Sequence, residues 1–126
     1  MQENLRALLS AARIASEKSY SPYSAFPVGA AVLTGGGKVY TGANVENASY
    51  GATMCAERVA VYKAVSDGEK EILALAVYAP KAMPFPCGMC LQVLSEFAGD
   101  IPVLLADEEE ERFLTLRELL PHPFEK

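Results

Sequence analysis

The sequence predicts an α/β fold, a three-layer α/β/α sandwich, and three features lead to this class. Strand-like apolar segments alternate with helix-like segments along most of the chain. Two strand–helix–strand units require crossover connections, which favour parallel central strands with helices on both faces of the sheet. The chain has 126 residues, of which 51% are hydrophobic, and a domain of this size buries roughly two-thirds of its unfolded surface. We therefore expect residues 1–126 to form a single domain.

The first part of the chain predicts one helix and a β-hairpin. Between residues 4 and 18, apolar side chains recur at helical spacing with charged residues on the other side, as in an amphipathic helix. The sequence SPYS at 21–24 ends this pattern and predicts a loop. Residues 28–33 and 38–42 are expected to pair as strands, because the three glycines at 35–37 tolerate a positive φ in the turn.

The second part predicts two more helices and three more strands. A helical pattern runs from 55 to about 66 and ends at Asp67 and Gly68. Residues 72–79 are apolar almost throughout, which indicates a central strand covered on both faces. The remaining expectations are a helix over 88–97, strands over 102–106 and 112–116, a helical turn over 117–120 and a solvated acidic turn over 108–111.

Composition argues against several classes of function. The net charge of −5 does not provide the basic surface that nucleic acid requires, so we expect no nucleic-acid partner. The longest apolar run, 72–79, is far shorter than the roughly 20 residues of a membrane helix, so we expect no membrane partner. The first residues, MQEN, do not begin like a signal peptide. Three cysteines cannot all pair within one chain, and we expect reduced thiols and a cytoplasmic location.

All three cysteines lie in two short motifs, MCAER at 54–58 and PCGMC at 86–90. Cys87 and Cys90 stand three residues apart at the start of an expected helix, so they can reach the same metal ion. Cys55 opens the other expected helix, and the dipoles of both helix N-termini favour thiolates. The combination C-x-E and P-C-x-x-C resembles the pattern of zinc-dependent nucleobase deaminases. It predicts one Zn²⁺ per chain.

The number of ligand-type side chains favours a zinc site with one position left to water. Zinc takes four ligands, and the chain offers three cysteines and one histidine, His122, which lies between two prolines. If His122 reached back to the metal, the site would be closed and structural. Glu57 is expected to act as a general base and acid that moves a proton from this water to the substrate. The alternatives for Glu57 are a fourth ligand or a helix N-terminal charge.

Arg58 is expected to support the same site. Its guanidinium can donate hydrogen bonds to the ligand sulfurs and offset the charge of three thiolates. The alternative is an ordinary surface arginine on a helix.

Together with other segments, these motifs make the chain resemble the small homotetrameric cytidine deaminases of the zinc-dependent cytidine/deoxycytidylate deaminase superfamily. The matching segments are SPYS at 21–24, FPVGAA at 26–31, NVENASY at 44–50, MCAER at 54–58, PCG at 86–88 with Cys90, QVL at 92–94 and LLP at 119–121. The resemblance covers nearly the whole chain. It implies a mixed five-stranded sheet, zinc held by Cys55, Cys87 and Cys90, and Glu57 as the proton shuttle.

The resemblance also implies the substrate contacts. Asn44 and Glu46 would hold the ribose hydroxyls, Phe26 would stack on the pyrimidine, and the backbone around Ala56 would face the edge of the base. Without the resemblance, Asn44 and Glu46 would be interpreted as turn residues and Phe26 as a core aromatic. An amide and a carboxylate in one loop do suit a sugar hydroxyl, which both donates and accepts.

Three further residues are implied to act between subunits of a homotetramer. Ala48, Tyr50 and Phe124 would reach the pockets of neighbouring subunits. An apolar tail that ends near Phe124 would also be better buried against a partner than left in solvent.

The implied function is hydrolysis of cytidine and 2'-deoxycytidine to uridine and 2'-deoxyuridine, with release of ammonia, in pyrimidine salvage. One alternative is deamination of another cytosine nucleoside, such as blasticidin S. A second is a non-catalytic binding protein stapled by zinc, against which the presence of Glu57 argues. Two departures from the family pattern bear on efficiency and substrate range: Met89 replaces a small residue and Leu91 replaces an arginine.

Overall fold

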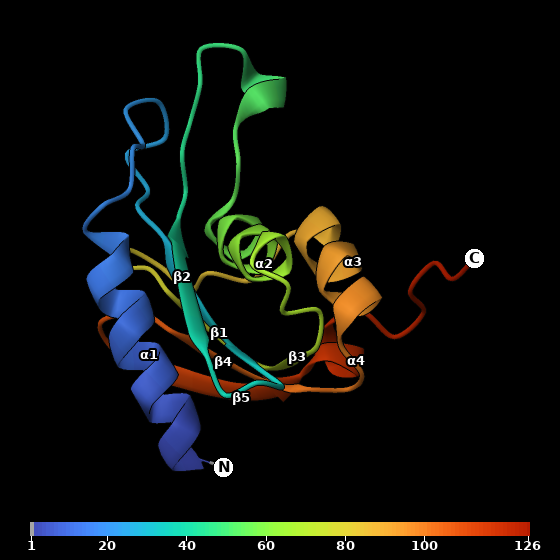
Figure 1. Cartoon of the computed structure of the whole chain (residues 1–126). Helices are drawn as coiled ribbons and strands as arrows, with labels where there is room; N and C mark the ends of the chain where they lie inside the picture. Colours follow the sequence, from blue (N-terminus) through green and yellow to red (C-terminus); the bar gives the residue numbers. More distant parts are fainter. Residues whose placement is uncertain (1) are drawn as a thin grey trace.

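A computed structural model describes residues 2–126, which form a five-stranded sheet with helices on both faces (Figure 1). The helices are α1 (Gln2–Ser16), η1 (Tyr50–Ala52, a 3₁₀ turn), α2 (Ala56–Ser66), α3 (Gly88–Phe97) and α4 (Leu116–Leu119). The strands are β1 (Gly29–Thr34), β2 (Val39–Ala43), β3 (Ile72–Tyr78), β4 (Pro102–Ala106) and β5 (Glu111–Thr115). The predicted α/β class and the number of strands are confirmed. The observed boundaries of α3 and β4 equal the expected ones, and the others differ by one or two residues, as is usual where helix and strand ends fray.

The strand order is β2-β1-β3-β4-β5, and β3 with β4 is the parallel pair. Strand β1 pairs antiparallel with both β2 and β3, and β5 is antiparallel to β4. Parallel pairing of the central strands is therefore correct for β3 and β4, which α3 connects, and wrong for β1. The unit β2–α2–β3 also joins strands of the same direction, but the hairpin partner β1 lies between them.

The sheet is covered by α1 on one face and by α2 and α3 on the other, which gives the three expected layers (Figure 1). Because side chains alternate across a strand, β3 contributes to both cores: Ala74, Ala76 and Tyr78 pack with α1, while Leu75 and Val77 pack toward α2 and α3. Each fully buried Leu or Val stabilises the fold by about 1.5–3 kcal/mol. Within residues 2–126, none of the helices is long and apolar enough to cross a bilayer.

Two glycines allow the helix backbones to lie directly on the sheet. A Cβ atom on Gly29 would lie 1.9 Å from the carbonyl oxygen of Ala12 in α1. A Cβ atom on Gly42 would lie 2.5 Å from the carbonyl oxygen of Ala56, the first residue of α2. Gly42 therefore determines how closely the start of α2, with the motif that contains Cys55, approaches the sheet.

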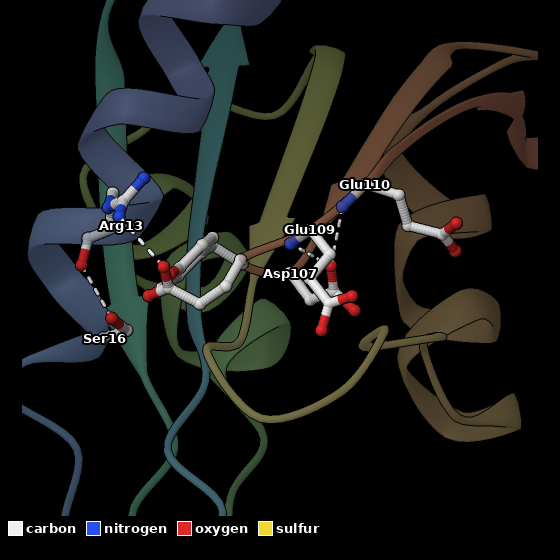
Figure 2. A network of polar contacts seen from close by, with 7 residues as sticks. Arg13, Ser16, Asp107, Glu109 and Glu110 are labelled. Carbon is white, nitrogen blue, oxygen red and sulfur yellow. Dashed lines mark hydrogen bonds and ion pairs between the residues drawn. The ribbon is translucent and has the colours of Figure 1, made fainter.

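The acidic segment after β4 forms a turn that its own side chains stabilise (Figure 2). The Asp107 carboxylate accepts hydrogen bonds of 2.8 Å from the backbone N–H groups of Glu109 and Glu110, and these bonds lower the pKa of Asp107. Arg13 of α1 lies 5.0 Å from the centre of the Tyr78 ring and pairs with Glu108 at 3.5 Å. The expected solvated turn is present, and Arg13 attaches it to α1.

Candidate active site

The two cysteine motifs stand at the starts of two helices that pack against each other. Cys55 is the N-cap residue of α2 and Cys87 is the N-cap residue of α3, both with extended backbone. Cys90 lies in the first turn of α3 and is buried. The Sγ atoms of Cys55, Cys87 and Cys90 all lie within 4.8 Å of one another. The helix N-termini thus bring together three sulfur ligands that are 35 residues apart at most in the sequence.

These three sulfurs fit a zinc ion. A tetrahedral zinc with Zn–S bonds of about 2.3 Å separates its sulfur ligands by roughly 3.8 Å, and the Cys87 and Cys90 sulfurs are 3.5 Å apart. Within residues 2–126, the exposed His122 and the carboxylate of Glu57 lie outside this cluster. The protein therefore offers three ligands, which is the number that a catalytic rather than a structural zinc site has.

Arg58 makes the contact with a ligand sulfur that the sequence led us to expect. Its Nη2 atom donates to Cys55 Sγ at 3.3 Å. The interaction between Cys55 and Cys90 lowers the pKa of the Cys55 thiol to about 5 and raises that of Cys90. The hydrogen bond from Cys90 is the main cause of the fall, and Arg58 adds to it. The surroundings of Cys55 thus favour the thiolate form that binds metals.

Glu57 lies in the first turn of α2 and is 5% exposed. Burial raises the pKa of its carboxyl to about 7, and the negative charge of Cys55 adds to the rise, whereas Arg58 opposes it. A group whose pKa is near the working pH is suited to accept a proton and later return it. The start of α2 therefore carries both a ligand of the cluster, Cys55, and an acid/base group, Glu57.

A cavity of about 420 Å³ opens beside the cluster. It is lined by Glu57, Cys55 and Cys87 together with four of the residues expected to contact a substrate: Phe26, Asn44, Glu46 and Ala56. The segments that meet here come from the loop before β1, the loop after β2 and the starts of α2 and α3. The fold thus brings these expected residues to one place.

The other three expected contact residues lie elsewhere on the chain. Tyr50 is 77% exposed and Phe124 is 74% exposed, and Ala48 is exposed as well. Tyr50 belongs to η1 at the tip of the loop that projects beyond the sheet between β2 and α2 (Figure 1). Ala48, Tyr50 and Phe124 are not among the described residues that line the cavity.

Asn44 and Glu46 also hold the loop before β1. The Asn44 amide oxygen accepts from the Val28 N–H at 2.9 Å, and its NH₂ group donates to the Phe26 carbonyl at 2.9 Å. Glu46 Oε1 accepts from the N–H groups of Tyr23 at 2.9 Å and Ser24 at 3.0 Å. The interpretation of both as turn residues is therefore correct in addition to their place at the cavity.

Sequence reasoning missed six residues of the cavity wall: Ser24, Val28, Thr53, Met54, Pro84 and Phe85. Phe85 stands between two buried prolines, directly before the motif with Cys87, and the local sequence does not mark it as a site residue. The Arg112 guanidinium lies 5.7 Å from the centre of the Phe85 ring. Nothing local in the sequence predicts this long-range contact.

The two departures from the family pattern, Met89 and Leu91, lie in different environments. Leu91 is 6% exposed and packs in the core between the sheet and its helices, where an apolar side chain is favoured. Met89 is 65% exposed and is not among the described residues lining the cavity. Met89 therefore does not narrow this cavity.

A family model described as "Cytidine and deoxycytidylate deaminase zinc-binding region" matches residues 2–105. The chain belongs to the cytidine and deoxycytidylate deaminase family. The cytidine deaminase of Sporosarcina psychrophila is 48% identical over 94% of this chain and 90% of the relative. That of Halalkalibacterium halodurans is 48% identical over 87% of this chain and 86% of the relative.

Solved structures of this deaminase family have the same fold. The crystal structure of cytidine deaminase from Burkholderia pseudomallei covers 94% of this chain and 98% of its own, with a TM-score of 0.88 and 43% identity. A blasticidin-S deaminase from Bacillus cereus is a more distant relative, 33% identical over 75% of this chain and 74% of its own. The resemblance that the motifs indicated is thereby confirmed.

Proposed function

We propose that this member of the deaminase family hydrolyses cytidine and 2'-deoxycytidine to uridine and 2'-deoxyuridine, with release of ammonia. The observation that supports this most directly is the buried Glu57, which lines the same cavity as two of the three clustered cysteines. A metal-ligand cluster beside an acid/base group is what hydrolytic removal of an exocyclic amine requires.

In this proposal, Cys55, Cys87 and Cys90 hold one Zn²⁺ per chain, and Glu57 is the proton shuttle. When bound, zinc lowers the pKa of a coordinated water toward neutrality. Glu57 accepts a proton as the water oxygen adds to C4 of the cytosine ring, and it delivers this proton to the ring nitrogen. Glu57 then takes the remaining proton from the hydroxyl group on C4 and gives it to the exocyclic amine. The C4–N bond breaks, the C4 oxygen becomes the carbonyl of uridine, and ammonia leaves. Arg58 stabilises the thiolate of Cys55 throughout.

The cavity residues hold the nucleoside in place. Phe26 stacks on the pyrimidine, Asn44 and Glu46 bind the ribose hydroxyls, and the backbone at Ala56 faces the edge of the base. The proximity of these residues to Glu57 in one cavity supports the assignment. Accurate positioning of this kind is a large part of the rate that enzymes achieve.

Assembly and location follow from the same proposal. The chain acts as one domain and forms a homotetramer, in which Ala48, Tyr50 and Phe124 reach pockets of neighbouring subunits. The exposure of two of their aromatic rings supports this role. The protein works in the cytoplasm, where thiols stay reduced, in pyrimidine salvage and without a nucleic-acid partner.

The alternative substrate is a cytosine nucleoside such as blasticidin S. Asn44 and Glu46 at the cavity favour the plain nucleoside, because each can bind a sugar hydroxyl. The relative named for the antibiotic is less similar than those named for cytidine.

A substrate panel tests the proposal. Zinc-loaded protein is mixed with cytidine, 2'-deoxycytidine, free cytosine or blasticidin S, and the loss of absorbance near the cytosine maximum is followed. We expect turnover of both nucleosides, and a kcat/KM for free cytosine about 100-fold lower because binding energy from the sugar is lost. Turnover of blasticidin S alone would support the alternative. A folded, zinc-loaded chain that turns over none of the four would contradict an enzymatic function.

A further inference from the structure

The hydroxyl of Ser24 connects two residues to which the proposed function gives different tasks. Ser24 Oγ donates to Glu46 Oε2, and it accepts from the backbone N–H of Phe26 at 3.0 Å. Glu46 is the proposed ligand of the sugar, and Phe26 is the proposed stacking partner of the base. Ser24 itself lines the cavity with both of them.

The contacts to Glu46 occupy both of its carboxylate oxygens. Oε1 accepts from the N–H groups of Tyr23 and Ser24, and Oε2 accepts from the Ser24 hydroxyl. The Ser24 hydroxyl is the largest cause of a lowered pKa at Glu46, so the side chain is a carboxylate at neutral pH. A carboxylate can only accept hydrogen bonds, and this one has its orientation fixed by three donors.

The loop between Ser24 and Phe26 has a backbone conformation that its neighbours maintain. Ala25 has φ = 55°, in the left-handed region that a residue with a Cβ atom rarely adopts. Its N–H donates to the Ser21 carbonyl at 2.9 Å, and its carbonyl accepts from Nζ of Lys81. The Asn44 amide holds the Phe26 carbonyl at 2.9 Å. Such a conformation persists only where surrounding contacts determine it, and residues with such conformations are concentrated at functional sites.

We propose that Ser24 is a positioning residue that couples sugar recognition by Glu46 to base stacking by Phe26. One hydroxyl fixes the carboxylate in the direction that accepts a hydrogen bond from the sugar, and the same oxygen anchors the backbone that presents the Phe26 ring. Loss of the hydroxyl therefore weakens both contacts at once. This inference rests on the proposed function, because it uses the tasks that the proposal gives to Glu46 and Phe26.

The kinetic test compares cytidine with 2',3'-dideoxycytidine, which lacks the 2'- and 3'-hydroxyls of the ribose. The variants are Ser24→Ala, Ser24→Thr, which keeps the hydroxyl, and Ser10→Ala, the same change at an exposed position of α1. For Ser24→Ala we expect KM for cytidine to rise about 10-fold with kcat within about 3-fold, as for loss of one hydrogen bond to a charged group. We also expect its preference for cytidine over the dideoxy analogue to fall at least about five-fold. Ser24→Thr and Ser10→Ala should behave like the original chain.

A second readout does not depend on turnover. Hydrogen exchange of the Phe26 amide should be at least about 10-fold faster in Ser24→Ala than in Ser24→Thr, because the amide loses its acceptor. Ser24 is exposed, and should the alanine variant nevertheless fail to fold, Ser24→Cys keeps the shape and weakens the bond.

The outcomes separate this inference from the proposed function. If the unmodified chain deaminates cytidine but Ser24→Ala keeps its preference within two-fold and its Phe26 exchange unchanged, the coupling is wrong and the function stands. A failure of Ser24→Thr equal to that of Ser24→Ala would also overturn the coupling, since the hydroxyl would not be the cause. If the unmodified chain deaminates nothing, the proposed function is wrong. In that case hydrogen exchange still tests the contact between Ser24 and Phe26: an unchanged exchange rate of the Phe26 amide in Ser24→Ala would contradict it.

Discussion

Two neighbouring side chains at the start of α2 have their pKa values moved in opposite directions by their surroundings. Burial raises the pKa of the Glu57 carboxyl to about 7, while hydrogen bonds from Cys90 and Arg58 lower that of the Cys55 thiol to about 5. The first shift produces a group that exchanges protons near neutral pH, and the second produces a metal ligand. Arg58 has a part in both, because its charge stabilises the thiolate and limits the rise at Glu57.

Arg58 is consequently the residue whose removal should affect the metal cluster without removing a ligand. For Arg58→Met, which keeps the length of the side chain and deletes the charge, we expect zinc affinity or kcat/KM to fall about 10- to 100-fold. Competition with a coloured chelator measures the affinity, and deamination of cytidine measures the rate. Arg6→Met is the matched control, because Arg6 makes an exposed ion pair with Glu111 of the kind that contributes little. Equal behaviour of the two variants would contradict the role of Arg58.

At the level of single residues, the sequence was sufficient to predict functional residues of a type that is rare in the chain. Cysteine occurs three times in the chain, all within the two motifs, so the ligand cluster could be predicted from spacing alone. Ser24 and Phe85 could not, because their roles come from contacts with Glu46 and Arg112, which are 22 and 27 positions further along. Serine and phenylalanine are common enough that local sequence does not distinguish such positions.

At the scale of elements, the position of the site depends on how α2 is seated on β2. Gly42 lies where the two backbones touch: a Cβ atom there would be 2.5 Å from the Ala56 carbonyl oxygen and 2.6 Å from the Ala60 nitrogen. Both are backbone atoms of α2, which cannot move aside as a flexible side chain would. The helix that holds Cys55 and Glu57 would have to shift as a unit.

Gly42→Ala should therefore reduce both stability and activity. We expect a loss of about 1–3 kcal/mol, as for overpacking a tight contact, or roughly 3–10 °C in Tm, and a lower zinc content because Cys55 moves relative to Cys87 and Cys90. Thermal unfolding and metal analysis measure these effects. The control is Gly99→Ala, at a position where an added Cβ atom has no described neighbour within 4 Å. A Gly42→Ala protein as stable as the control would show that α2 does not pack tightly against β2 at Gly42.

A local sequence pattern determines where a helix begins and ends, but it does not determine the order of the strands in the sheet. Helix α3 begins and ends where the sequence predicted, at Gly88 and Phe97, because Pro86 and the glycine at 99 punctuate the pattern. The position of β1 between β2 and β3 was not predicted, because strand order depends on pairing between residues far apart in the sequence. Sequential strands are neighbours in a sheet only about two-thirds of the time, and β2 and β3 are an exception.

At the scale of the whole molecule, Tyr50 and Phe124 are the two most exposed aromatic side chains of the described residues, and neither lines the cavity. Tyr50 lies at the tip of the projecting loop (Figure 1), and Phe124 lies in the tail after α4. The tail is held in place, since the Gln92 amide bonds both the N–H of Phe124, at 3.0 Å, and its carbonyl, at 2.9 Å. A tail fixed by its backbone, with the ring outward, is suited to insertion into a neighbouring copy.

We accordingly expect sedimentation of the protein at four times the mass of one chain. Phe124→Ala should lower kcat/KM for cytidine about 10-fold or more, the equivalent of 1.5–3 kcal/mol for an aromatic ring that is no longer buried. Glu125→Ala, the same truncation at the next residue, should leave kcat/KM unchanged. A monomer with full activity, or equal effects of the two variants, would contradict an active site completed by a neighbouring subunit.

The role of Glu57 is tested most directly by comparing cytidine turnover and zinc content between the unmodified chain and Glu57→Gln. We expect about one zinc per chain in both proteins, since Glu57 lies outside the sulfur cluster. We expect kcat of the variant to fall at least about 10²- to 10⁴-fold, because an amide cannot transfer the proton. A variant that loses its zinc would show that Glu57 is a ligand. A variant that keeps both its zinc and its turnover would show that deamination does not use the Glu57 carboxylate, which would contradict the proposed mechanism.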